Sequence, residues 1–182
     1  MWVWIAVGVA VLLVIIFIAM YNGFVKADQR VKEAFSTMDV YLVKRWEMIP
    51  KLVETVKAYA GHEKDVFSGI TQLRNGSYSS MTDAEKITAN ATMSKEIGKL
   101  LGVAEAYPEL KSSNNFIELG KALSSIEDEI ANARKYYNGT VRLFNNKTET
   151  FPGNVFAKLF GFSSKEMYEA AAEERGNVRI DL

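Results

Sequence analysis

The chain has 182 residues, and its 22 Lys and Arg residues balance 22 Asp and Glu residues, so its formal net charge is zero. This balance excludes the whole-chain basic field that draws proteins to nucleic acids, so we expect no nucleic-acid partner. The absence of Cys excludes disulfides, thiolate metal ligands and Cys nucleophiles, and abundant Ala, Lys, Glu and Leu with only three Pro favour long helices.

The first 25 residues carry no charged side chain. Within them, residues 2–20 are almost entirely apolar and would measure about 28 Å as a helix, close to the roughly 30 Å of bilayer hydrocarbon. We predict a membrane anchor at residues 1–25, formed around Trp2, Trp4, Leu12, Ile16 and Tyr21. A cleaved secretory signal and a buried core helix are the alternatives, and the length of the apolar stretch disfavours both. For a signal, a Lys or Arg should also precede the apolar residues and a small-x-small cleavage site should follow them, and neither is present.

The charges that flank the anchor predict its orientation. Lys26, Arg30 and Lys32 follow the apolar residues, and no basic residue precedes them. Because basic flanks stay in the cytoplasm, we expect the N-terminus outside and the rest of the chain in the cytoplasm.

A helical period begins after the anchor. Apolar residues recur at alternating steps of four and three from Val31 to Tyr59, which is typical of the seam of a bundle or coiled coil. No stop signal separates this seam from the anchor, so we predict one rigid helix that rises out of the membrane. The seam keeps its register across Pro50, which predicts a kink and not an end. Gly61 could end the helix, but the sequence after it continues in helical style, and we predict that the helix runs to Arg74.

Two more long helices follow. The first begins at the capping box Thr82-Asp83-Ala84-Glu85 and ends before Pro108. Ser112-Ser113-Asn114 caps the next helix, which runs to about Thr150. The apolar face predicted for the helix after Thr82 consists of Ile87, Ala91, Ser94, Ile97, Leu101 and Ala104.

The C-terminal part contains a short apolar segment and a predicted last helix. Residues 155–162 are mostly large and apolar. Ser163-Ser164-Lys165-Glu166 has the pattern of a capping box and predicts a helix that closes near Gly176. The tail, residues 177–182, alternates apolar and polar residues and is either extended or a fraying terminus.

These elements predict an all-α fold, in which an N-terminal transmembrane helix is continuous with an antiparallel, four-helix-like bundle. The predicted domains are an anchor at 1–25, a helical bundle at 26–176 and an extended tail at 177–182. With two reversals, the helix that ends at Thr150 would run in the same direction as the first helix, which places residues 155–162 far from the anchoring membrane. A parallel, self-associated coiled coil would use the same apolar seams.

Residues 155–162 form a candidate interaction patch. Five of these eight residues are large and apolar: Val155, Phe156, Leu159, Phe160 and Phe162. One interpretation is a short helix folded back to cover the end of the bundle. The other is an exposed apolar surface for a second protomer or for a membrane.

Arg45 is a charged residue at a seam position, between Leu42 and Ile49. An unpaired buried charge is costly, so two interpretations stay open. The side chain either extends its charged end to water, or it forms a buried ion pair that fixes the register of the helices, with Glu105, Glu127 or Glu129 as the possible partner.

Catalytic and metal-binding patterns are missing from the sequence. His62 is the only histidine, which excludes the paired Glu-x-x-His ligands of di-iron bundles and the H-E-x-x-H zinc site. The phosphate-binding loops and the G-x-S-x-G nucleophile elbow do not occur either. We therefore expect no enzyme activity and no cofactor. His62 is either a hydrogen-bonding residue on or between helices, or a ligand or pH switch.

Several short motifs, taken together in their order and spacing, resemble the LemA family of bacterial membrane proteins. They are Tyr21-Asn22-x-x-Val25, Lys44-Arg45-Trp46-Glu47-Met48-Ile49-Pro50, Tyr59-Ala60-x-His62-Glu63, Glu105-x-Tyr107-Pro108-Glu109-Leu110-Lys111, Ala133-Arg134-Lys135-x-Tyr137-Asn138 and Phe151-Pro152. The resemblance implies an antiparallel helical bundle on a single span in the bacterial inner membrane. It implies no established biochemical activity, although a related protein of magnetotactic bacteria takes part in forming magnetosome membranes.

We therefore expect a membrane-anchored helical-bundle scaffold that self-associates and helps to organise or shape membrane. Its expected partners are the lipid bilayer, further copies of the chain and an unidentified protein. The alternative is a membrane-bound docking or regulatory module for another membrane or signalling protein.

Overall fold

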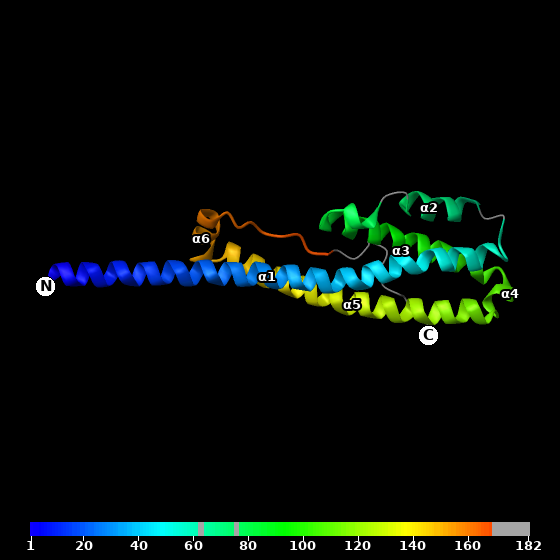
Figure 1. Cartoon of the computed structure of the whole chain (residues 1–182), viewed down its shortest axis with the longest axis horizontal. Helices are drawn as coiled ribbons and strands as arrows, with labels where there is room; N and C mark the ends of the chain where they lie inside the picture. The colour runs from blue at the N-terminus through cyan, green and yellow to red at the C-terminus, as the bar shows by residue number, and fades with distance from the viewer. Residues whose placement is uncertain (62–63, 75–76, 169–182) are drawn as a thin grey trace, which may run out of the picture. The chain divides into compact units, whose positions relative to one another are not determined.

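The computed structural model describes residues 1–61, 64–74 and 77–168, and these residues form helices without any strand. The elements, which Figure 1 shows, are α1 (Trp2–Lys57), α2 (Lys64–Arg74), the 3-10 helix η1 (Tyr78–Ser80), α3 (Asp83–Glu105), α4 (Pro108–Lys111), α5 (Asn114–Glu149) and α6 (Gly153–Phe160). The predicted all-α class is confirmed.

The chain forms two compact units. Among the described residues, unit 1 consists of 1–37 and 133–167, and unit 2 consists of those within 38–132 together with Tyr168. The long helices α1 and α5 each contribute to both units, and each unit has its own buried core.

The core of unit 1 lies between the first part of α1 and the last part of α5. The rings of Phe35 and Tyr137 meet edge to face, with their centroids 5.7 Å apart. Phe24 and Phe144 both contact Phe162, at 5.2 and 6.2 Å. Because residue numbers rise along α1 as they fall along α5, the two helices are antiparallel. The buried residues of these two helices in unit 1 are Phe24, Val31, Ala34, Phe35, Ala133, Tyr137, Val141, Phe144 and Thr148.

The core of unit 2 buries the second part of the predicted seam of α1. Pro50 lies inside α1, so it does not end the helix. Phe67 and Ile70 of α2 and Leu123 and Ile130 of α5 are also buried. The seam residues buried in this unit are Met38, Leu42, Arg45, Ile49, Leu52 and Val56.

α1 ends at Lys57, and the predicted continuation of this helix to Arg74 is wrong. The N–H groups of Tyr59 and Ala60 both donate to the carbonyl of Val56, at 3.1 and 2.9 Å, so the final turn tightens. Ala60 is buried there, whereas Gly61 after it has low helix propensity. Charged residues after this point continue the helical composition, but the packing of α2 against α3 requires the chain to turn first.

This turn adds a chain reversal that the sequence-based topology lacks. With it, α5 runs antiparallel to α1 within unit 1, and α6 returns to the beginning of α1. The predicted position of residues 155–162, far from the anchor, is therefore wrong. Phe156 of α6 contacts Phe17, which belongs to the apolar residues of the predicted anchor.

The predicted starts of α3 and α5 are confirmed. At α3, the Glu85 N–H donates to Thr82 Oγ1 at 3.3 Å, and the Thr82 N–H donates to the Glu85 carboxylate at 2.7 Å, which completes the capping box. At α5, the Phe116 N–H donates to Ser113 Oγ at 3.3 Å. The predicted face of α3 is partly wrong, because Leu101 is exposed. The buried residues of α3 are Asn90, Met93, Glu96, Ile97, Leu100 and Ala104.

The capping box predicted at residues 163–166 does not open a helix, because residues 163–168 are not helical. Side chains of α5 take up the backbone hydrogen bonds of this segment. Asn145 Oδ1 accepts from the Lys165 N–H and Asn145 Nδ2 donates to the Lys165 carbonyl, both at 2.8 Å. The Tyr137 hydroxyl donates to the Glu166 carbonyl at 3.2 Å. The rest of the predicted last helix and the tail at 177–182 lie outside the described residues.

We predict that Asn145→Ala releases residues 163–167 from α5. The substitution removes both hydrogen bonds to Lys165, which should lower the free energy of unfolding of unit 1 by about 1–3 kcal/mol. Hydrogen exchange of the Lys165 amide should accelerate in the detergent-solubilised protein. The matched control is Asn146→Ala, at an exposed position one residue away, which should change neither quantity. Equal effects of the two substitutions would contradict the role of Asn145.

Candidate functional site

The candidate site begins at the apolar stretch, residues 2–20 of α1. Every side chain from Trp2 to Ala19 is exposed in the structure. Because consecutive helical residues point about 100° apart, this exposure means that α1 is apolar on all sides here, as membrane-spanning helices are. α1 is long and apolar enough to cross a membrane. The exposed fractions of the predicted anchor residues are 83% for Trp2, 79% for Trp4, 56% for Leu12, 43% for Ile16 and 46% for Tyr21.

An aromatic cluster joins the end of the apolar stretch to α6. The ring of Phe160 lies 4.9 Å from Phe17, 5.1 Å from Tyr21 and 6.4 Å from Phe24, between centroids, each time edge to face. Phe156 adds a second contact to Phe17 at 6.1 Å. Such ring pairs are favourable beyond their buried area. The full aromatic cluster consists of Phe17, Tyr21, Phe24, Phe144, Phe156, Phe160 and Phe162.

Two glycines at the ends of α6 allow this helix to dock. Gly153 is buried against the backbone carbonyl of Lys147, where any side chain would collide. Gly161 has a φ of 76°, which favours glycine, and the Phe162 N–H behind it donates to the Ala157 carbonyl at 2.9 Å. This cap turns the chain so that Phe162 stacks on Phe24.

The predicted interaction patch divides between two faces of α6. Phe156 and Phe160 face the apolar stretch, and Phe162 packs on Phe24 and Phe144. Val155 and Leu159, one helical turn apart, are 58% and 65% exposed. These two residues form what we call the outer face of α6.

Charged residues come after the aromatic cluster along the sequence, both in α1 and in the segment that follows α6. Asp28 of α1 pairs with Lys32 at 2.8 Å and with Lys165 at 2.7 Å. Burial raises the pKa of the Asp28 carboxyl, but the hydrogen bonds and charges of Lys165 and Lys32 outweigh it, so this pKa is lower than usual. The Lys147 ammonium lies 4.8 Å from the centroid of the Phe24 ring, and burial lowers its pKa.

We predict that Asp28 makes the stability of unit 1 sensitive to acid. A carboxyl group with a lowered folded-state pKa contributes stability above its usual pKa of 3.8, and this contribution is lost as the pH falls through the folded-state pKa. Asp28→Asn should therefore lower the melting temperature at pH 7, and the difference from the unmodified protein should vanish in stronger acid. Glu33→Gln, at an exposed position of α1, is the control and should show no such gap. A gap that is independent of pH would exclude the ion pairs as its cause.

A second polar site surrounds Arg45 in unit 2. The Arg45 side chain is fully buried, and its Nη1 donates to both carboxylate oxygens of Glu127, at 2.9 and 3.0 Å. Nη1 also donates to Ser94 Oγ at 3.0 Å, and Nη2 donates to the carbonyl and side-chain oxygens of Asn90 at 2.9 and 2.8 Å. Of the three candidate partners, the structure brings Glu127 to Arg45. It leaves Glu105 exposed at the end of α3 and Glu129 exposed on α5.

The hydrogen bonds of Arg45 continue into a chain of polar groups, which we call the arginine network. Asn90 Nδ2 donates to the Tyr78 hydroxyl at 3.0 Å, and this hydroxyl donates to Asp39 Oδ1 at 2.9 Å. Lys86 neutralises Asp39 at 2.7 Å. Burial, together with the hydrogen bond to Asp39, raises the pKa of Tyr78, so the phenol stays neutral. The network therefore fixes α1, η1, α3 and α5 within unit 2.

We predict an asymmetric response to removal of the partners in this network. Glu127→Ala leaves the buried Arg45 guanidinium without a countercharge and should lower the free energy of unfolding by about 3–5 kcal/mol. Combining it with Arg45→Met removes the buried charge and should restore a large part of this loss. Glu129→Ala, at an exposed position two residues away on α5, is the control. Chemical denaturation measures all of these variants, and equal losses for Glu127→Ala and Glu129→Ala would refute the buried pair.

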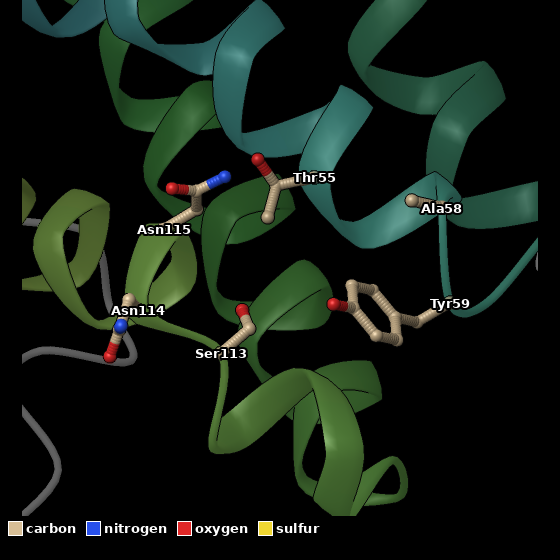
Figure 2. Close-up of a pocket in the computed structure, with 6 residues that line it drawn as sticks. All are labelled: Thr55, Ala58, Tyr59, Ser113, Asn114 and Asn115. Carbon is tan, nitrogen blue, oxygen red and sulfur yellow. The ribbon is translucent and has the colours of Figure 1, made fainter.

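Unit 2 also contains an open depression of about 400 Å³ at the end of α1, which Figure 2 shows. It is lined by Thr55, Ala58, Tyr59, Ser113, Asn114 and Asn115. Two of its hydroxyls already serve the backbone, since Thr55 Oγ1 donates to the Lys51 carbonyl and Ser113 Oγ caps α5. The lining contains no carboxylate or amine, so this depression offers neutral hydrogen-bonding groups and no general acid–base pair.

Metal ligation is not supported within the part of the chain that the structure describes, because no three His, Cys, Asp or Glu residues converge there. His62 lies outside these residues. Sequence reasoning missed Asn90, Tyr78, Asp39 and Lys86 as parts of the arginine network. The available signal was the seam position of Arg45, which required polar partners on the facing helices.

Known proteins resemble this chain along most of its length. A family model described as the LemA family matches residues 34–182. Protein LemA of Metamycoplasma hominis is 26% identical over 167 residues, which cover 90% of this chain and 75% of that protein. Magnetosome protein MamQ 2 of Paramagnetospirillum magneticum is 24% identical over 191 residues, with coverages of 88% and 70%. Magnetosome protein MamQ of Magnetospirillum gryphiswaldense is 23% identical, with coverages of 81% and 64%.

Proposed function

Because this chain belongs to the LemA family, we propose that it is a single-span membrane protein whose helical units self-associate and organise the membrane around them. The observation that carries this proposal is the apolar stretch, which is exposed on all sides while α6 packs against its last turns. The family match begins at residue 34, so the span is argued from its own residues.

Exposure of so many large apolar side chains is unfavourable in water. Transfer of apolar surface out of water gains about 25 cal/mol per Å², and the residues that the structure describes leave the apolar stretch uncovered for most of its length. A bilayer provides the missing apolar surroundings. The helical backbone satisfies its own hydrogen bonds there, as a membrane-spanning segment must.

The proposed orientation places the charged side of α1 in the cytoplasm, at the bacterial inner membrane. Lys26, Arg30 and Lys32 support it by the positive-inside rule. Lys158 and Lys165 add positive charge near the same end of the apolar stretch, since α6 and the segment after it pack on α1 there.

We assign the protein no catalytic role. Three ion pairs join separate segments of the chain and serve packing: Arg45 with Glu127, Lys86 with Asp39, and Lys165 with Asp28. A scaffold needs such packing surfaces and no reactive group. The names of the relatives from magnetotactic bacteria, magnetosome proteins, support a role connected with membranes.

We predict that charges in the apolar stretch release the protein from membranes. Leu12→Lys together with Ile16→Lys should cost about 2.5–3.5 kcal/mol per lysine at the centre of a span, and alkaline extraction should then free the protein. The matched control is Val40→Lys, which changes an equally exposed apolar residue of α1 outside the stretch and should leave the protein in the membrane. Retention of the double variant would refute the span.

Self-association is tested separately, by light scattering of the full chain after detergent extraction. A discrete assembly of several copies supports the scaffold. A monomer at all concentrations would overturn it in favour of the docking or regulatory module, which acts through another protein.

A further inference from the structure

We propose that α6 is a second membrane-contacting element, which lies in the lipid interface beside the cytoplasmic end of the span. Its outer face, Val155 and Leu159, contacts acyl chains of that leaflet. The proposal rests on the proposed function, because it takes the apolar stretch to cross the bilayer. It adds an interaction surface on a different helix and names lipid as the partner of that surface.

The depth of α6 follows from its contacts with α1. A helix rises about 1.5 Å per residue, so Phe17 lies about 13 Å and Tyr21 about 7 Å on the apolar side of Lys26, the first charged residue. Phe160 touches both rings. Amphipathic helices at membrane surfaces bury their apolar side about 5–10 Å into the boundary between headgroups and acyl chains. The contacts hold α6 at this level.

The faces of α6 suit this position. At about 100° per residue, apolar side chains occupy roughly 200° of its circumference, from Val155 through Phe156 and Phe160 to Ala157. Only Asn154 and Lys158 occupy the remaining arc. A helix docked on protein alone needs one apolar side, but α6 has an inner side for the aromatic cluster and an outer side that the described residues leave exposed. Lys158 has a stem long enough to carry its ammonium to the headgroups.

α1 and the C-terminal segment from Phe160 to Lys165 both change from aromatic to charged residues, and the change occurs at the same height along α1. Along α1, the order is Phe17, then Phe24, then Asp28. In the C-terminal segment, Phe160 packs on Phe17, and two residues later Phe162 stacks on Phe24. Lys165 then pairs with Asp28 at 2.7 Å. A lipid interface changes from hydrocarbon through an aromatic belt to charge in this order, so the paired gradient matches a bilayer.

The absence of Cys from the chain allows a direct test, because a single introduced Cys is the only labelling site. Leu159→Cys in the full chain, labelled with an environment-sensitive nitrobenzoxadiazole dye and reconstituted into phosphatidylcholine–phosphatidylglycerol vesicles, reports on the outer face. We expect blue-shifted emission and strong quenching by brominated lipids. Lys158→Cys, one residue away on the polar arc, should show a smaller shift and weaker quenching. Ser36→Cys, about 22 Å beyond Tyr21 along α1, should show neither.

Three outcomes would overturn the proposal. Emission at Leu159 equal to that at Ser36, without lipid quenching, means that the outer face is in water. Blue-shifted emission without lipid quenching, which weakens when the protein is diluted in excess lipid, means that a second copy covers the face. Emission that is blue-shifted at any dilution but insensitive to brominated lipids means that α6 packs more deeply on its own chain. In all three cases, persistent resistance to alkaline extraction would leave the span itself intact, so the two proposals fail separately.

Discussion

The antiparallel packing of α5 on α1 is the constraint on which the aromatic cluster of unit 1 depends. In unit 1, the ring of Phe35 contacts Tyr137. The ring of Phe162 contacts both Phe24 of α1 and Phe144 of α5. This pairing returns the chain to the beginning of α1. α6 then contributes Phe156 and Phe160 to the aromatic cluster, and the following segment is held to α5 by Asn145. If α5 ran in the opposite direction, α6 would not lie beside the end of the apolar stretch that precedes the first charged residues.

Helix types and most helix ends could be predicted from the sequence, because their signals are local. The capping box at Thr82, the cap at Ser113 and the seam of α1 each lie within a few residues of the structure they specify. The end of α1 at Lys57 could not be predicted in this way. The residues beyond it retain a helical composition, and only the packing of α2 on α3 requires the turn. One missed turn then reversed the expected direction of α5.

The candidate site was predictable to a lesser extent, because its side chains meet across long sequence separations. The seam position of Arg45 identified it as an unusual residue, but its partner Asn90 lies outside the face that the sequence predicts for α3. Its burial rotates the buried face of α3 away from Leu101. The capping-box pattern at 163–166 misled for a related reason: the side chains of Asn145 and Tyr137 bind backbone groups that a helix would have used. Tertiary hydrogen bonds here override a correct local pattern.

Buried polar side chains in this protein act mainly as helix connectors. The arginine network links four elements of unit 2, and the Tyr78 phenol stays neutral within it. In unit 1, the ion pairs of Asp28 secure the segment that follows α6. Hydrogen bonds from both terminal nitrogens of Arg45 to three partners favour one arrangement of helices, although the buried Nε of this residue has no partner.

Unit 1 is assembled from the two ends of the described chain, residues 1–37 and 133–167. During synthesis the apolar stretch leaves the ribosome before unit 2. Its aromatic partners on α6 follow more than 130 residues later, since Phe17 and Phe156 are 139 positions apart in the sequence. The intervening residues include nearly all of unit 2, which has a core of its own. Domains generally fold as units during synthesis, so unit 2 can form early and shorten the loop that unit 1 must close. The order of synthesis thus favours the docking of α6 on the apolar stretch as the last step in the assembly of unit 1.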